Sequence, residues 1–142
     1  MRDIANVFFL SAVLCVTAGM VLGLWMGPTG NFQFAPVHAH LNLLGWVTMA
    51  LFAIYYRLTP RAAQGRLPRV HAALAIPGVL LMSGGLAVEI AGRPEGFPVI
   101  VLGAFLSFGS MLIFLFTVLR YGFGVAQASG HGARLGAAIG AV

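Results

Sequence analysis

Long apolar segments separated by short polar connections make up most of this chain. Each has the roughly 20 apolar residues that an α-helix needs to cross the hydrocarbon core of a bilayer. They cover about residues 4–27, 35–58, 69–91 and 97–121. The connections are rich in proline and glycine, which is typical of neighbouring antiparallel helices. The pattern predicts an all-α membrane protein, with four transmembrane helices in residues 1–122 and a Gly/Ala-rich tail over 123–142.

The composition supports insertion into a membrane. Hydrophobic residues make up 60% of the 142 residues, and charged residues only 8%, which no soluble domain of this size requires. The first apolar segment is longer than the about 7–15 residues of a signal-peptide core, and no A-x-A site follows it, so we expect a membrane helix. The lone Cys15 lies within this segment. We expect it to be a small apolar core residue.

Basic residues are distributed unevenly between the predicted connections. All eight are arginines, and the formal net charge is +5. Such a charge can indicate nucleic-acid binding, but most of the arginines flank apolar segments on one side, so no nucleic-acid partner is expected. Four of them border the second connection: Arg57, Arg61, Arg66 and Arg69. The positive-inside rule then predicts a multi-pass protein of the bacterial inner (cytoplasmic) membrane with both termini in the cytoplasm.

Two histidines near the start of the second segment are the main chemical feature. His38 and His40 would lie in the outer third of that helix, where an ionisable side chain usually faces protein, a cofactor or water. At about 100° per residue their rings point to roughly opposite sides of the helix. They cannot easily bind one metal together. Either they are interfacial residues bonded to head groups and water, or each serves a different binding site.

The residues that follow favour a binding site for haem. Asn42 is a third polar group in the same turn, Gly45 would leave room for a flat ligand, and Trp46 offers aromatic surface. Imidazole is a common ligand of haem iron, and apolar walls suit a porphyrin. We therefore expect a cofactor site formed by these residues.

The stretch His38–Met49 resembles the tenth membrane helix of the catalytic subunit of haem-copper oxidases and nitric oxide reductases. That helix carries an H-x-H motif, which in the reductases reads much like H-G-H-L-x-x-x-G. In the family the first histidine binds the high-spin haem and the second the low-spin haem. The resemblance implies that His38 and His40 hold b-type haem iron. This chain departs from the family because it has far fewer helices and lacks the copper-site histidines.

The family's fold also implies an oligomer. Its helices form three arcs of four, so three copies of this chain would supply the same number. We expect a homotrimer in which His38 of one chain and His40 of the next face a shared pore with one haem. Arg93 follows Glu89 by four residues. It either forms an intrahelical ion pair or binds the haem propionates.

Two function classes remain open. The first is electron transfer, or sensing of a diatomic gas such as NO or O2. Oxidase or nitric oxide reductase activity is less favoured because no second metal site is visible. The second is an accessory subunit of a respiratory oxidase, or a factor that delivers haem or copper to one. Copper is the weaker choice because Met26 and Met49 form no M-x-x-M cluster.

Three further features lead to expectations of their own. A doubled G-x-x-x-G in the first segment (Gly19, Gly23, Gly27) predicts close helix contact, either within the chain or between chains. His71 is expected to be an interfacial histidine beside Arg69. His131 in the tail is expected to have no function.

Overall fold

The chain folds into four long helices, and no strand occurs in the part that the structure describes. A computed structural model describes residues 3–124. Four helices are long and apolar enough to span a membrane, and the second of them has three parts. The elements are α1 (Ile4–Thr29), α2 (Ala35–His40), η1 (Leu41–Thr48), α3 (Met49–Leu58), α4 (Leu67–Ile90) and α5 (Gly96–Tyr121). The expectation of an all-helical fold with four helices long and apolar enough to span a membrane is confirmed for residues 3–124. His131 and most of the predicted tail lie outside the described residues.

The first helix begins and ends at residues suited to those positions. The Asp3 carboxylate accepts a hydrogen bond from the backbone N–H of Ala5 at 3.2 Å and so caps the N-terminus. At the other end Gly30 has a φ of 64°, the left-handed conformation that commonly terminates a helix. The helix thus includes Pro28. It extends two residues beyond the predicted end at residue 27.

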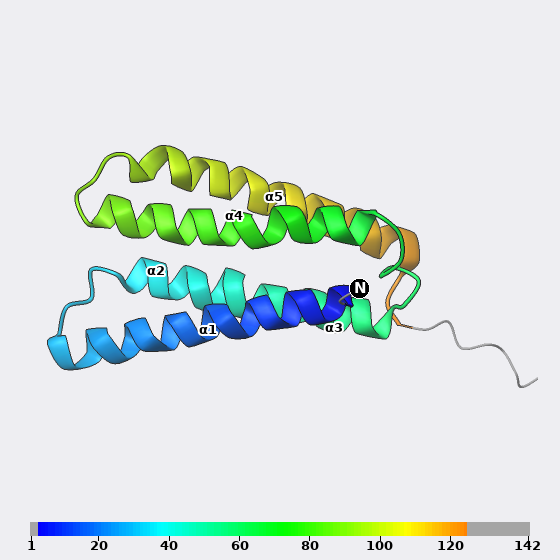
Figure 1. The fold of residues 1–142 in the computed structure, drawn as a ribbon, viewed down its shortest axis with the longest axis horizontal. Helices are drawn as coiled ribbons and strands as arrows, with labels where there is room; N and C mark the ends of the chain where they lie inside the picture. Colours follow the sequence, from blue (N-terminus) through cyan, green and yellow to red (C-terminus); the bar gives the residue numbers. More distant parts are fainter. Residues whose placement is uncertain (1–2, 125–142) are drawn as a thin grey trace, which may run out of the picture.

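The helices form two hairpins that lie side by side (Figure 1). In one, α1 lies along α2, η1 and α3; in the other, α4 lies along α5. The α1–α2 and α4–α5 connections lie at one end of the molecule. The start of α1, the α3–α4 connection and the end of α5 lie at the other end. An ion pair of 3.1 Å between Arg57 and Asp3 joins the end of α3 to the start of α1. Four exposed arginines gather there with Arg57: Arg61, Arg66, Arg69 and Arg120.

Small residues bring α4 and α5 into close contact. A Cβ atom added to Gly78 would lie 2.8 Å from the backbone nitrogen of Ser107, and one added to Gly85 would lie 2.8 Å from that of Ile100. Gly103 similarly faces the backbone of Met82. Such residues allow backbones to approach closely in a bilayer, where apolar side chains gain little by leaving lipid. The second hairpin is therefore held by backbone-to-backbone packing.

Aromatic rings from all four long helices meet near the arginine-rich end. Phe8 stacks on Tyr56 with ring centroids 5.8 Å apart, and Phe52 lies 4.5 Å from Phe114. His71 lies among these rings and is fully buried. The prediction of an interfacial His71 is wrong: the ring faces the interior of the bundle, where it joins the two hairpins.

Candidate cofactor site

His38 lies against the glycine-rich face of α1. Its Nδ1 atom is 2.8 Å from the carbonyl oxygen of Gly19, and the ring is half-buried. A Cβ atom added to Gly23 would lie 3.0 Å from the imidazole Cε1 atom. Gly19 and Gly23, the first two glycines of the G-x-x-x-G stripe, therefore make room for side chains of the second helix of the same chain. Gly27 has no atom within 4 Å of its Cβ position.

His40 is held by its own helix. Its Nδ1 atom lies 2.7 Å from the carbonyl oxygen of Pro36, one turn earlier. This hydrogen bond is exposed, whereas the hydrogen bond between His38 and Gly19 is partly buried. The two histidines of α2 are thus oriented by different elements.

These hydrogen bonds fix the tautomer of both rings. A carbonyl oxygen can only accept a hydrogen bond, so Nδ1 carries the proton in His38 and in His40. In a neutral imidazole the other nitrogen, Nε2, then carries a lone pair. Histidines that ligate metals show this arrangement, because the bond at one nitrogen orients the ring and makes the other a better ligand. In the neutral state both rings would therefore present an Nε2 lone pair to a metal ion.

Asn42 supports the backbone that carries His38. Its amide Nδ2 donates to the carbonyl oxygen of His38 at 2.7 Å. The same amide fills the space beside Gly19, since a Cβ atom there would lie 2.8 Å from Nδ2. Asn42 therefore lies between α2 and α1 and has a partner within the protein.

Gly45 does not leave an open space for a ligand. Its Cβ position lies 2.5 Å from the Cβ atom and 2.8 Å from the Sγ atom of Cys15, and 3.6 Å from Val79. The glycine therefore marks a close crossing of the second helix with α1. The prediction that Gly45 leaves room for a ligand is therefore wrong. The prediction that Cys15 is a buried core residue is confirmed.

Trp46 lies next to α1. Its ring centroid is 6.3 Å from that of Phe9, and the side chain is partly buried against the core. Its aromatic surface is shared with a neighbouring helix of the same chain.

The second helix widens directly after the histidines. Leu41–Thr48 forms a π-helix, and the Thr48 hydroxyl donates to the carbonyl oxygen of Leu43 at 2.9 Å. π-helical turns are rare and occur often at functional sites. Hydropathy contains no signal for this feature. The Thr48 hydroxyl bonds to a carbonyl five residues earlier, as the wider turn allows.

One chain does not supply a complete set of metal ligands in residues 3–124. No group of three or more His, Cys, Asp or Glu side chains there is arranged to hold a metal ion. A haem iron with two imidazole ligands would need the second ligand on the opposite face of the porphyrin.

Arg93 and Glu89 are not an intrahelical pair. The helix ends at Ile90, and Gly92 has a φ of 84°, so Arg93 lies beyond the helix and is exposed. The Glu89 Oε2 atom is buried and has no hydrogen-bond partner among the described residues. Arg93 belongs to the α4–α5 connection, which lies at the same end of the molecule as α2 (Figure 1).

His71 and Tyr56 form a second polar group that the sequence did not reveal. The Tyr56 hydroxyl and the His71 Nδ1 atom are 2.9 Å apart, and both side chains are buried. The His71 Nε2 atom is buried without a hydrogen-bond partner in residues 3–124. The bond spans two long helices and so contributes to packing of the hairpins.

Comparison of the chain with family models, with curated proteins and with solved structures finds no match in any of the three.

Proposed function

We propose that this protein binds b-type haem through His38 and His40 and serves electron transfer or the sensing of a diatomic gas. One observation carries the proposal: both imidazoles donate Nδ1–H to a backbone carbonyl, which leaves Nε2 as a free ligand. The resemblance of His38–Met49 to the H-x-H helix of haem-copper oxidases and nitric oxide reductases supports the same cofactor.

The protein's own residues would hold the cofactor and tune it. The Gly19 carbonyl orients His38, and the Pro36 carbonyl orients His40. Arg93, exposed at the same end as α2, is a suitable partner for the haem propionates because its planar guanidinium binds carboxylates in two-point fashion. When bound, haem supplies one-electron redox chemistry and, at an open iron position, binding of NO or O2.

The arrangement of the two imidazoles on α2 favours an oligomer. At about 100° per residue His38 and His40 point to roughly opposite sides of the helix, so we infer that each bis-histidine site takes its second ligand from another copy. We infer a homotrimer of antiparallel four-helix units, similar to the three arcs of the oxidase core. The five arginines at one end of the bundle favour a cytoplasmic location for that end and for both termini, in a bacterial inner membrane.

A second candidate is an accessory subunit or a haem- or copper-delivery factor of a respiratory oxidase. A carrier holds its cargo through few ligands and releases it, and the H-x-H pair of α2 supplies two imidazoles at most. Copper is less favoured than haem because no methionine cluster accompanies the histidines.

The haem content of the purified protein distinguishes these functions. The full chain is purified in mild detergent, with haem supplied during expression, and haem per chain is measured as the pyridine haemochrome. We expect a fixed haem-to-chain ratio that withstands size-exclusion chromatography. His38→Ala and His40→Ala should each reduce it by about tenfold or more, since even the loss of a partner that orients a metal ligand costs about 10–100-fold in affinity.

His131→Ala provides the matched control and should leave the haem content unchanged. A haem content that is unaffected by His38→Ala and His40→Ala would contradict the proposed ligands. Haem that dissociates from wild type during chromatography would favour the delivery function. A haem-containing monomer would contradict the trimer.

A further inference from the structure

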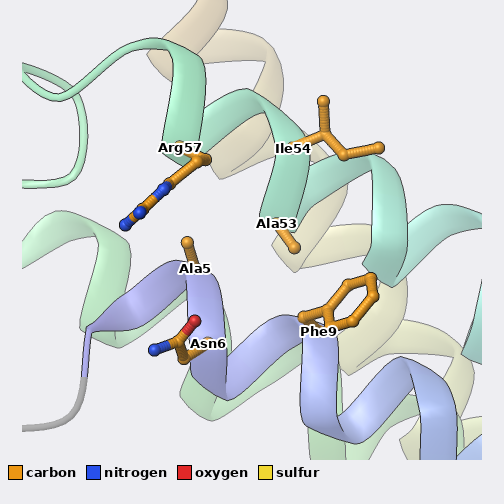
Figure 2. A pocket seen from close by; sticks show the side chains of 6 residues that line it. All are labelled: Ala5, Asn6, Phe9, Ala53, Ile54 and Arg57. Atoms are coloured by element: carbon orange, nitrogen blue, oxygen red, sulfur yellow. The ribbon is translucent and has the colours of Figure 1, made fainter.

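A groove lies between α1 and α3 at the arginine-rich end of the bundle. Its volume is about 230 Å³. Figure 2 shows the six residues that line it: Ala5, Asn6, Phe9, Ala53, Ile54 and Arg57. Both of its walls belong to the first hairpin, and it is separate from the histidines of α2.

The groove has a polar end and an apolar end. Arg57 and Asn6 lie at one end, and the Phe9 ring lies at the other (Figure 2). Ala5 and Ala53 are small and buried, and they form its floor. Phe9 and Ile54 are 49% and 48% exposed, on a surface that the membrane would cover. A ligand that fits this groove has a polar head and an apolar tail.

The polar end suits an anion. The Arg57 guanidinium uses one nitrogen, Nη1, to contact Asp3, and its side chain remains 75% exposed. Its other N–H groups remain available for a phosphate. The Asn6 amide is exposed and makes no hydrogen bond within residues 3–124. Asp3 is the one acidic residue described at this end, against five arginines.

We propose that this groove binds one acidic phospholipid. Its phosphate would lie between the Arg57 guanidinium and the Asn6 amide, and an acyl chain would lie along Phe9 and Ile54. Clusters of basic residues at the cytoplasmic end of membrane helices attract anionic lipids. The small floor residues allow the tail to lie close to the helix backbones. The proposal is independent of haem binding.

The ion pair between Asp3 and Arg57 allows a test in which lipid binding should increase. Asp3 competes with the phosphate for Arg57, so Asp3→Asn should increase binding of an anionic lipid. Asparagine is also a good N-cap, so α1 should remain intact. A gain of binding cannot result from misfolding. The test therefore stays informative if other variants are unstable.

The experiment measures lipid retained on the full-length protein by native mass spectrometry. Purified protein in detergent receives phosphatidylglycerol or phosphatidylcholine with the same acyl chains. We expect about fivefold more phosphatidylglycerol to be retained, and Arg57→Gln should abolish this preference. Arg69→Gln is the matched control, because Arg69 is exposed at the same end but does not line the groove. Excess inorganic phosphate should not displace the lipid.

Three results would overturn the proposal. Equal retention of the two lipids by wild type would show that no anionic site exists. An equal loss in Arg57→Gln and Arg69→Gln would show diffuse attraction by the arginine-rich end. Displacement of the lipid by inorganic phosphate would show a site for free phosphate.

Discussion

The Nδ1 nitrogen of His38 lies 2.8 Å from the carbonyl oxygen of Gly19, so a backbone group of α1 orients the first imidazole of the H-x-H pair. The glycine-rich face of α1 makes this approach possible, because a side chain at Gly19 or Gly23 would meet Asn42 or His38. The two features that stood out separately in the sequence, the glycine stripe and the histidine pair, are parts of one contact.

Gly23→Ala should disturb this contact. The added Cβ atom would lie 3.0 Å from the His38 ring, which must shift or move away from α1. We expect a loss of about 1 kcal/mol or more of stability from overpacking. Haem retained by the purified protein should also fall.

Gly27→Ala is the matched control, because it lies in the same stripe and has nothing within 4 Å of its Cβ position. It should leave the haem content unchanged and should be neutral or stabilising, because alanine is the better helix former. If Gly27→Ala lowers haem content as much as Gly23→Ala does, the stripe acts between chains and the intrachain explanation fails.

Gly45→Ala should destabilise the protein without direct contact with His38 or His40. The new Cβ atom would lie 2.5 Å from that of Cys15, so α1 and the π-helix must separate. Overpacking of this kind costs about 1–3 kcal/mol. Thermal unfolding in detergent measures the change. In the double variant Cys15→Gly with Gly45→Ala, part of the loss should be recovered, since the two sites are coupled.

Gly84→Ala is the control for Gly45→Ala, since no atom lies within 4 Å of its Cβ position. Alanine is the better helix former by about 1 kcal/mol, so this variant should be neutral or more stable. Equal destabilisation by both substitutions would argue against a close crossing at Gly45.

Tyr56→Phe tests the bond between α3 and α4. It removes the hydroxyl that lies 2.9 Å from His71 Nδ1 and leaves that buried nitrogen without its partner. A cost of about 1–2 kcal/mol is expected for an unpaired buried group. The unfolding midpoint should fall accordingly.

Tyr121→Phe removes a hydroxyl that makes no hydrogen bond within residues 3–124, and it should have little effect on stability. A Tyr56→Phe variant as stable as Tyr121→Phe would show that the bond to His71 adds nothing to the packing of the hairpins.

The four long helices could be predicted from the sequence because length and hydropathy alone define a membrane span. All four starts and ends lie within about two residues of the predictions. The position of Arg57 beside Asp3 also agrees with the charge pattern, since both were expected at the same end of the bundle.

Contacts between helices could not be predicted, because they depend on rotation of each helix about its axis. Hydropathy is similar all around α1 and α4, so it does not indicate which face is buried. His71 was expected to be an interfacial histidine beside Arg69 and is buried within the bundle, and Gly45 was expected beside a ligand and faces Cys15. The π-helix has no hydropathy signal, because it changes the hydrogen-bond register and leaves the composition unchanged.

The reduced-minus-oxidised visible spectrum of the purified protein tests the central proposal most directly, because it reports both the haem and its axial ligands. Reduction with dithionite should give the sharp α band of a six-coordinate b-type haem in wild type and in His131→Ala. That band should be lost in His38→Ala and in His40→Ala. A protein that stays colourless after haem is added, or a band that survives in both variants, would contradict haem ligation by this pair.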